Sequence, residues 1–373
     1  MSIYAERRAK LFDWMKRENV FLAIFEDTEG RRDPSIRWLS GHPGDALMAL
    51  TIDNHSMLIP WDKNLAIFMS DAEIIIPYSE FERNSLKAIR GVADYFQLPF
   101  GSRAEIPPQT PYPLFLRYVE ALSDYDVICH EEGGIHAEIT ALRAVKDPTE
   151  IGIYRRLSDI TNELIELLEK MVHERVITTE LDAALFIEAQ CREYGCEGTG
   201  FETLAAGPTR SFGIHAFPAY TAEAFATQGL SILDFGVKWQ GYTSDVTLTF
   251  AHPPLSRTQT RMLTLTEKAY NLALNMVGNN VPVRSIAAEV DRFFANAKKA
   301  MPHGLGHGIG LEAHEAPAIR NHADNDWVLK PGMIFTLEPG LYDPAHGGCR
   351  LENDILLTET GVETLTKARI IRL

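Results

Sequence analysis

The sequence contains little cysteine and no long apolar run. Its four cysteines form no Cys-x-x-Cys pair and are too sparse for a disulfide framework. No stretch of roughly 18 apolar residues is present, so we expect no membrane-spanning helix and no membrane partner. The charged opening residues are not followed by the apolar core of a signal peptide. These absences predict a protein of the reducing cytoplasm.

Positive charge is also scarce relative to negative charge. The chain has 36 lysines and arginines against 51 aspartates and glutamates, which gives a formal net charge of −15. A surface of that sign repels nucleic acid and anionic membranes, so we expect neither as a partner. The 373 residues suffice for about two domains, each with its own core, and the hydrophobic content of 45% is ordinary for a globular protein.

The most informative segment that is present runs from residue 303 to residue 317 and is rich in glycine. It carries histidines at 303, 307 and 314 among glycines at 304, 306, 308 and 310. Each glycine would cost roughly 1 kcal/mol in a helix interior, so we expect an extended or turning backbone. Glycine at every second position also lets a chain pass close to something bulky, such as a metal centre or a bound substrate. A connecting loop with unrelated histidines is the alternative.

Four acidic residues and one histidine form a candidate metal-binding set, which consists of Asp234, Asp245, His307, Glu338 and Glu352. The carboxylates carry four formal negative charges, which two divalent cations would balance. Oxygen-rich ligation with one imidazole suits Mn, Co, Zn or Fe(II), and no cysteine belongs to the set. We therefore expect two divalent metal ions, with Mn as the first choice.

Strand pairing is expected to bring the first two acids together. Residues 231–237 and 243–250 are apolar or β-branched runs on either side of a short turn, which is typical of a hairpin. A two-residue turn at Trp239-Gln240 would put Asp234 directly opposite Asp245, with their Cβ atoms about 5 Å apart. Like charges in that position destabilise a sheet unless a cation lies between them.

The same reasoning applies to the last two acids. A second hairpin centred near Ala345 would bring Glu338 opposite Glu352. Two acidic pairs at hairpin register, together with the histidine-rich segment, favour a metal site over a solvated acidic surface.

The order Asp, Asp, His, Glu, Glu, with its flanking residues, resembles the metallopeptidase superfamily with the pita-bread fold. That superfamily includes methionine aminopeptidase, aminopeptidase P, prolidase and the metal-free creatinase. The resemblance is strong over about residues 140–373 and looser before them, where residues 33–42 resemble an element of the creatinase-type N-terminal domain. It implies that all five residues of the set are metal ligands, and that Asp245 and Glu352 bridge both ions.

The resemblance also implies roles for residues outside the ligand set. His314 matches the histidine that contacts the substrate and the tetrahedral intermediate, and His215 falls about where the family keeps its other active-site histidine. His303 and Arg350 match positions that help to hold the substrate's proline or its carboxylate. A purely structural histidine is the alternative for His215, and a structural salt bridge to a ligand carboxylate is the alternative for Arg350.

The implied reaction is hydrolysis of the peptide bond before proline, as in an Xaa-Pro dipeptidase or aminopeptidase. Two metal ions would hold a bridging hydroxide as the nucleophile, and Glu338 would act as the general base. His314 and His215 would donate hydrogen bonds to the developing oxyanion or the leaving nitrogen. The substrate would be a small peptide with proline at the second position.

One departure from the family pattern concerns the substrate. The second-aspartate motif of proline-specific members runs Asp-x-Thr-Arg-Thr, whereas this chain has Leu248 in place of the arginine. The alternative function is therefore a metal-dependent C–N hydrolase of a non-peptide small molecule, with an ectoine-hydrolase-like or creatinase-like substrate. A catalytically inactive binding module and a metal-free creatinase-like enzyme are disfavoured, because such proteins lack ligands that this chain retains.

We predict an α/β (α+β) protein with a creatinase/prolidase-like N-terminal domain at residues 1–141 and a pita-bread catalytic domain at residues 142–373. Asp147 followed by Pro148 is a typical helix start. Helices are expected at 4–18, 79–95, 148–173, 179–194, 256–277 and 283–300, and N-terminal strands at 20–25, 46–52, 56–59, 66–69 and 72–76. The N-terminal domain favours the prolidase and aminopeptidase P branch, and the resemblance to that branch implies a homodimer.

Overall fold

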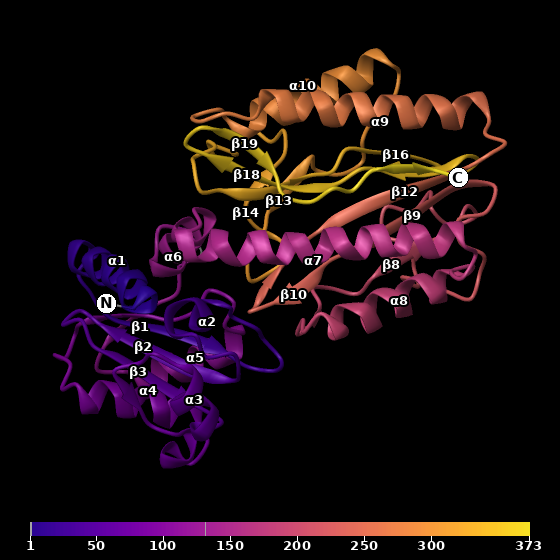
Figure 1. Ribbon diagram of the computed structural model, residues 1–373. Helices are drawn as coiled ribbons and strands as arrows, with labels where there is room; N and C mark the ends of the chain where they lie inside the picture. Colours follow the sequence, from indigo (N-terminus) through magenta and orange to yellow (C-terminus); the bar gives the residue numbers. More distant parts are fainter. Residues whose placement is uncertain (1, 131) are drawn as a thin grey trace. The chain divides into compact units, whose positions relative to one another are not determined.

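The computed structural model describes residues 2–130 and 132–373 (Figure 1). Within them the chain forms two compact units, Met1–Leu142 and Arg143–Leu373, each with its own sheets and helices. No helix in the described part of the chain is both long enough and apolar enough to cross a membrane.

The first unit is built on one six-stranded sheet with strand order β4-β3-β2-β1-β5-β6. Its strands are β1 (Val20–Asp27), β2 (Ala46–Thr51), β3 (Ser56–Pro60), β4 (Ile74–Ile75), β5 (Arg103–Glu105) and β6 (Asp126–Ile128). Its helices are α1 (Ile3–Glu18), α2 (Ser35–Ser40), α3 (Lys63–Met69), α4 (Ser85–Tyr95) and α5 (Tyr112–Ala121), and α6 (Ile135–Ala144) crosses the unit boundary. Apolar side chains of α4 and α5 pack against the sheet to form its core.

Residues 66–69, which we predicted as a strand, lie in helix α3. The Asp62 side chain accepts a hydrogen bond from the Leu65 amide at 3.0 Å and so caps the first turn of that helix. A short apolar run does not distinguish a strand from a helix, and here the cap decides in favour of the helix.

The helix predicted over residues 79–95 is divided in two. A 3-10 turn, η1 (Tyr78–Phe81), ends where Glu82 and Arg83 adopt left-handed backbone conformations with φ of 51° and 54°. The Asn84 side chain then caps a new helix, α4. The predicted elements at 4–18, 20–25, 46–52 and 56–59 are confirmed.

In the second unit, helices flank the sheets on two sides. Figure 1 shows α9 (Arg257–Met276) and α10 (Val283–Asn296) along one side of the strands, and α7 (Pro148–His173) and α8 (Glu180–Glu193) along the other. All four helices were predicted, although α10 ends before residue 300. The Asp147 side chain caps α7 in a capping box, and Pro148 is its first residue, as expected.

The sheets of the second unit carry the candidate site residues. One sheet has the order β20-β12-β9-β8, with β8 (Leu204–Ala206), β9 (Gly229–Phe235), β12 (Val246–His252) and β20 (Ile370–Arg372). Another has the order β14-β13-β15-β18-β19, with β13 (Gly306–Gly308), β14 (Glu315–Ile319), β15 (Ile334–Leu337), β18 (Asn353–Thr358) and β19 (Gly361–Thr364). Short ribbons are formed by β7 (Gly198–Thr199), β10 (Val237–Trp239) and β11 (Tyr242–Thr243), and by β16 (Gly340–Asp343) and β17 (Gly347–Arg350).

The first acidic hairpin differs in register from the prediction. Asp234 lies opposite Thr247, not opposite Asp245. The turn residues are Gln240 and Gly241, with φ of 49° and 87°, and a two-residue hairpin turn of this kind favours glycine at its second position. The turn therefore falls one residue later than predicted, which puts Asp245 diagonal to Asp234 on the same face of the hairpin.

The second acidic hairpin has the predicted register. The pairs Leu337↔Asn353 and Gly340↔Arg350 flank the two glutamates on either side, and both are centred on residue 345. This register brings Glu338 across from Glu352 and confirms the prediction.

Candidate metal centre

The five predicted ligand residues come from strands or strand ends of two sheets. Asp234 lies near the end of β9, Asp245 lies just before β12, and His307 is the central residue of β13. Glu338 follows β15, and Glu352 precedes β18. All five line one cavity of about 630 Å³, a volume within the usual range for a small-ligand site.

Carboxylates surround the imidazole of His307. Its Nε2 lies 3.7 Å from Asp245 Oδ2, 3.6 Å from Glu338 Oε1 and 3.9 Å from Glu352 Oε1. One ligand atom from each of Asp245, His307 and Glu352 lies within 4.8 Å of the other two. These separations are too long for hydrogen bonds, but they suit donor atoms that each lie about 2.0–2.2 Å from a shared cation.

Two carboxylate oxygens of the cavity lack partners. Asp234 Oδ1 and Glu352 Oε1 are buried and accept no hydrogen bond from any residue that the structure describes. A buried polar atom of this kind is costly unless something supplies the missing interaction. A divalent cation would supply it, so the residues present fit a metal site.

Burial and mutual repulsion disfavour negative charge in this cluster. Burial and the nearby Glu352 carboxylate raise the pKa of Asp245 and the pKa of Glu338 well above their usual values. Burial and the Asp234 charge raise the pKa of Glu352 to about 7. Burial lowers the pKa of His307 to about 3, which keeps the imidazole in the neutral form that binds metal. Bound cations would favour the ionised carboxylates.

Arg350 organises one wall of the cavity. Its side chain is 2% exposed, and Nη1 donates to the Tyr342 hydroxyl at 2.8 Å and to the Ile214 carbonyl at 3.0 Å. The Tyr342 hydroxyl lies 3.0 Å from His303 Nε2, and His303 Nδ1 lies 2.8 Å from the Gly304 carbonyl. Because a carbonyl only accepts, Nδ1 carries the proton and Nε2 accepts from Tyr342. Burial lowers the pKa of His303 to about 4, in agreement with a neutral ring.

His314 and His215 complete the cavity. The ring centroids of His314 and His307 are 4.2 Å apart. His215 comes from the segment between β8 and β9, and both His314 and His215 have exposed side chains. The structure thus brings every residue that we predicted for the site to one cavity, including His303 and Arg350.

The sequence analysis missed Thr247 and Asp354, which support the ligand residues. Thr247 Oγ1 donates to Glu352 Oε2 at 2.7 Å and accepts from Arg350 Nε at 2.9 Å. Asp354 is fully buried, and its Oδ2 accepts from the Asp245 amide at 3.2 Å. Each lies two residues beyond a predicted ligand, and this spacing was an available signal because alternate residues of a strand share a face.

Arg320 is the second arginine of the cavity and was also missed. It directly follows β14, its side chain is exposed, and it forms no ion pair with any described residue. Its guanidinium is therefore free to meet an anionic group of a bound molecule. No sequence motif marks position 320. Its local relation to the cavity is that Ala318, two residues earlier on the strand that it follows, also lines it.

The glycine-rich segment is extended, as predicted, but for a different reason. A Cβ atom on Gly306 would lie 2.0 Å from the Thr336 carbonyl oxygen, and one on Gly308 would lie 2.0 Å from the Ala316 carbonyl oxygen. These glycines let β13 pass close to its neighbouring strands, whereas we had related them to a bulky metal or substrate.

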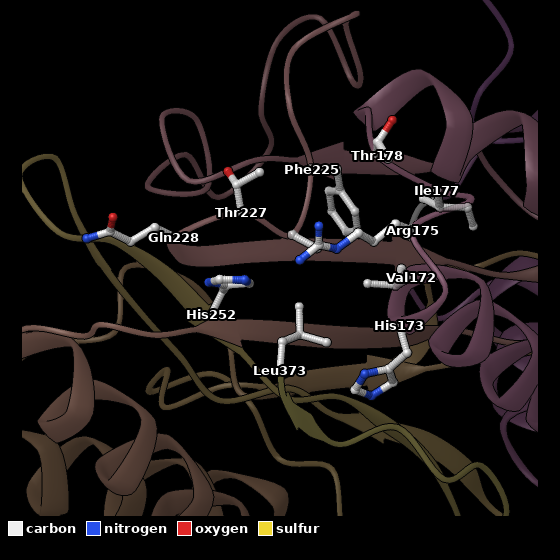
Figure 2. A pocket seen from close by; sticks show the side chains of 11 residues that line it. Val172, His173, Arg175, Ile177, Thr178, Phe225, Thr227, Gln228, His252 and Leu373 are labelled. Carbon is white, nitrogen blue, oxygen red and sulfur yellow. The ribbon is translucent and has the colours of Figure 1, made fainter.

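A second cavity, of about 450 Å³, lies in the same unit and contains none of the predicted site residues (Figure 2). Figure 2 shows Arg175, His252 and Leu373 among its lining side chains. No aspartate or glutamate occurs among the described residues that line it, so it lacks the carboxylate side chains that Mg²⁺ or Ca²⁺ prefers.

The fold and the carboxylate–histidine cavity define the class of metal-dependent hydrolases with the pita-bread fold. Comparison with known proteins then gives the family. Residues 152–359 match the model of metallopeptidase family M24, which covers more than half of the chain, and the chain belongs to that family.

The chain is also similar to individual members of known sequence or structure. It is 29% identical over 258 residues to an uncharacterized peptidase from Methanocaldococcus jannaschii, which covers 69% of this chain and 70% of that protein. It is 24% identical over 378 residues to the Xaa-Pro dipeptidase from Pyrococcus horikoshii, with 98% of both chains covered. The solved Xaa-Pro dipeptidase from Bacillus anthracis matches with a TM-score of 0.85 at 22% identity and covers 99% of this chain and 100% of that one. These matches confirm the predicted α/β fold and the resemblance to this family.

Proposed function

We propose that this metallopeptidase hydrolyses the peptide bond before proline in small peptides, as an Xaa-Pro dipeptidase or aminopeptidase. One observation carries the proposal, namely that all the predicted ligand and substrate-contacting residues line a single cavity. The relative that aligns over 98% of the chain is named an Xaa-Pro dipeptidase, which supports proline at the second position of the substrate.

We assign the metal-ligand roles to the five residues that surround the centre of the cavity, Asp234, Asp245, His307, Glu338 and Glu352. Four carboxylates offer the charge that balances two divalent cations, and a ligand set of mostly oxygen atoms with only one imidazole makes Mn the first choice, before Co, Zn or Fe. Asp245 and Glu352 are the proposed shared ligands of both ions. When bound, such cations supply Lewis-acid activation of a water molecule.

Glu338 is the proposed proton acceptor. Its side chain is 18% exposed, more than that of Asp245 or Glu352, so one oxygen is within reach of a bound substrate and its water. A peptide bond before proline has no N–H, and its nitrogen must gain a proton as it leaves. His314 and His215 are the proposed donors to that nitrogen and to the oxyanion.

His303 and Arg350 are proposed to form the wall that receives the substrate's proline. The hydrogen bonds that link Arg350 through Tyr342 to His303 fix both side chains in one orientation. Because these side chains are already held in place, the wall can bind the substrate's proline ring without rearrangement. Such a wall favours substrates whose ring fits its shape.

The alternative function, C–N hydrolysis of a non-peptide small molecule, has less support. The reason for this alternative was Leu248, which replaces the arginine of proline-specific members. Leu248 pairs with Leu233, is fully buried and is not among the described residues that line the cavity. The side chain at position 248 therefore packs in the core and does not contact the substrate. The relatives described above are peptidases by name.

We further propose a homodimer and a cytoplasmic location. Helix α3 exposes Ile67 and Phe68, with exposed fractions of 61% and 85%, and Trp61 nearby is 62% exposed. An exposed apolar group of this kind is typical of an interaction surface.

All four cysteines are free thiols, in keeping with a reducing compartment. The functional domains are proposed at residues 1–141 and 142–373.

The test is a substrate panel assayed with added Mn, Co or Zn and after treatment with a chelator. The panel holds Xaa-Pro dipeptides, Xaa-Pro-Yaa peptides, Met-Ala-Ser and several cyclic or guanidino amides. We expect metal-dependent cleavage of the Xaa-Pro members alone, and their relative rates separate a dipeptidase from an aminopeptidase. If protein shown to hold metal cleaves none of the peptides, the proposal is wrong and the small-molecule hydrolase is favoured.

A further inference from the structure

The loop from Gly207 to Thr221, here called the His215 loop, contains no helix or strand. His215 and Phe217 of this loop both line the cavity, and the Phe217 side chain is 95% exposed. One backbone hydrogen bond ties the loop to β8, from the Ala205 amide to the Ala219 carbonyl at 3.0 Å, and Arg350 Nη1 donates to the Ile214 carbonyl beside His215. No strand pairing runs through the loop, so the position of His215 also depends on the side chains that anchor the ends of the loop.

A single carboxylate holds both ends of the His215 loop. Glu180 Oε1 accepts from the Gly207 amide at 2.7 Å, and Glu180 Oε2 accepts from both the amide and the hydroxyl of Thr221 at 2.7 Å. Glu180 is 0% exposed. Buried hydrogen bonds to an ionised carboxylate are among the stronger ones in proteins, so this residue closes the loop at its base.

Arg210 extends the contact into the loop itself. Its Nη1 forms an ion pair with Glu180 Oε2, and its Nη2 donates to the Pro218 carbonyl. Pro218 lies three residues after His215, on the part of the loop that reaches the cavity. The two charged side chains thus connect the base of the loop to the segment that carries His215.

The anchoring carboxylate sits on a rigid element. Glu180 is the first residue of α8, which Thr179 caps in a capping box. The amides of Glu180 and Leu181 donate to the carbonyls of Glu223 and Thr221, at 3.0 Å and 2.9 Å. The first turn of the helix therefore holds the C-terminal end of the loop, and the negative charge of Glu180 is favoured at this end of a helix.

We propose that Glu180 and Arg210 are positioning residues that hold His215 at the edge of the cavity. This inference rests on the proposed function and deepens it, because it explains how an exposed histidine on a loop without regular structure keeps a fixed place. Neither residue lines the cavity, so both act on the reaction through the loop. A displacement of about 1 Å at a reacting group costs up to about 100-fold in rate.

The experiment compares Arg210→Met with the wild-type chain. The substitution removes the charge and keeps most of the side-chain volume. We expect kcat on Xaa-Pro substrates to fall about 10- to 100-fold while KM and metal content stay close to the wild-type values. Arg210→Lys, which keeps the charge, should recover part of the loss. Unchanged kcat in Arg210→Met would overturn the proposal.

A double-mutant cycle tests whether the effect passes through His215. In a His215→Ala background, Arg210→Met should cause no further loss, because the residue that it positions is gone. Losses that multiply independently would overturn the proposal. Arg192→Met is the control, since Arg192 lies on α8, the helix that carries Glu180, but pairs with Glu188 and the Glu197 carbonyl.

A third readout does not depend on activity. Hydrogen exchange of the amides in residues 208–220 should be faster in Arg210→Met and in Glu180→Gln than in the wild-type chain. Protection equal to that of the wild type in Arg210→Met would overturn the proposal even if Glu180→Gln fails to fold. If the wild-type chain cleaves no peptide, the proposed function fails, whereas the exchange measurement still decides whether the two residues hold the loop.

Discussion

Asp234 and Arg350 form a partly buried ion pair inside the candidate metal centre, with 2.5 Å between Asp234 Oδ2 and Arg350 Nη2. The pair turns Asp234 Oδ2 toward the guanidinium and leaves Oδ1 without a partner among the described residues. The charge of Arg350 against the four carboxylates of the proposed ligand set leaves three formal negative charges. The ion pair therefore orients one ligand and does not replace the cations that the site needs.

Removal of Glu352 should empty the site. Glu352 Oε1 is a buried, unpaired oxygen beside His307 and Asp245, so Glu352→Ala removes a central ligand. We expect activity to fall to the background rate and bound metal to be lost while the fold is kept, as measured by elemental analysis and circular dichroism. Glu359→Ala, at an exposed turn, is the control. Full activity in Glu352→Ala would show that the ligand assignment is wrong.

Removal of His314 should affect turnover but not metal binding. The His314 ring lies close to the His307 ring, tilted by 55°, without belonging to the carboxylate cluster. If it donates a hydrogen bond to the transition state, His314→Ala lowers kcat about 10²- to 10³-fold with metal content unchanged. His322→Ala, at an exposed position, should behave as the wild type. Loss of metal from the His314 variant would mean that the histidine roles are misassigned.

Arg320 should distinguish short from long substrates. It is the cavity arginine that forms no ion pair with a described residue, so it is placed to bind a free carboxylate. We expect Arg320→Ala to raise KM for Xaa-Pro dipeptides by about tenfold or more, and to change KM for Xaa-Pro-Yaa peptides less. Steady-state kinetics on both series is the measurement. Equal changes in both series would exclude carboxylate recognition by this residue.

The acid stability of the second unit should depend on Glu315. Burial alone would raise the pKa of Glu315, but Arg143 and Lys146 hold it below its usual value of 4.5. Such a carboxylate stabilises the fold above the unfolded pKa, and the stabilisation is lost as pH falls through the lower folded-state pKa.

Glu315→Gln tests this pH dependence. The variant removes the buried negative charge that faces Lys146 and Arg143, while Arg143 keeps its ion pair with Glu312. We therefore expect about 3 kcal/mol lower stability near neutral pH and a smaller difference in acid. Denaturant unfolding over a pH series is the measurement. Glu363→Gln, which removes an exposed ion pair, should change stability by about 1 kcal/mol or less at any pH. A Glu315→Gln difference that is constant with pH would contradict the assignment.

The proposed dimer should depend on the apolar face of α3. Phe68 is 85% exposed, and its replacement by glutamate places a charge at the centre of that face. We expect Phe68→Glu to shift the chain from dimer to monomer in light scattering. Leu185→Glu, at a position on α8 that is 53% exposed, should leave the mass unchanged. A monomeric wild-type chain would contradict the dimer directly.

The pairing of acidic residues across a hairpin could be predicted from the sequence where the turn geometry was simple. The hairpin of Glu338 and Glu352 is symmetric about residue 345, so counting gave the correct register. In the first hairpin the position of Gly241 selects a turn one residue later, and the predicted pairing of Asp245 with Asp234 was wrong. Both acids still share a face, because a shift of two positions in pairing preserves the alternation of a strand.

Contacts between segments that are distant in the chain could not be predicted from the sequence. The contacts of Arg350 with Ile214 and of Arg210 with Glu180 join segments far apart in the chain, and no period or spacing encodes them. Helix α3 was missed because the cap at Asp62 outweighs a short apolar run that reads equally well as a strand.

The close backbone approach at Gly306 and Gly308 has a consequence for how substrate preference in this chain can change. Any side chain on either position would collide with a carbonyl oxygen, so the His307 strand accepts no variation there. The remaining wall of the cavity includes side chains such as Leu204, Ala216 and Phe217. Engineering or evolution toward new substrates must therefore work through that wall, while the metal-bearing strand stays constant.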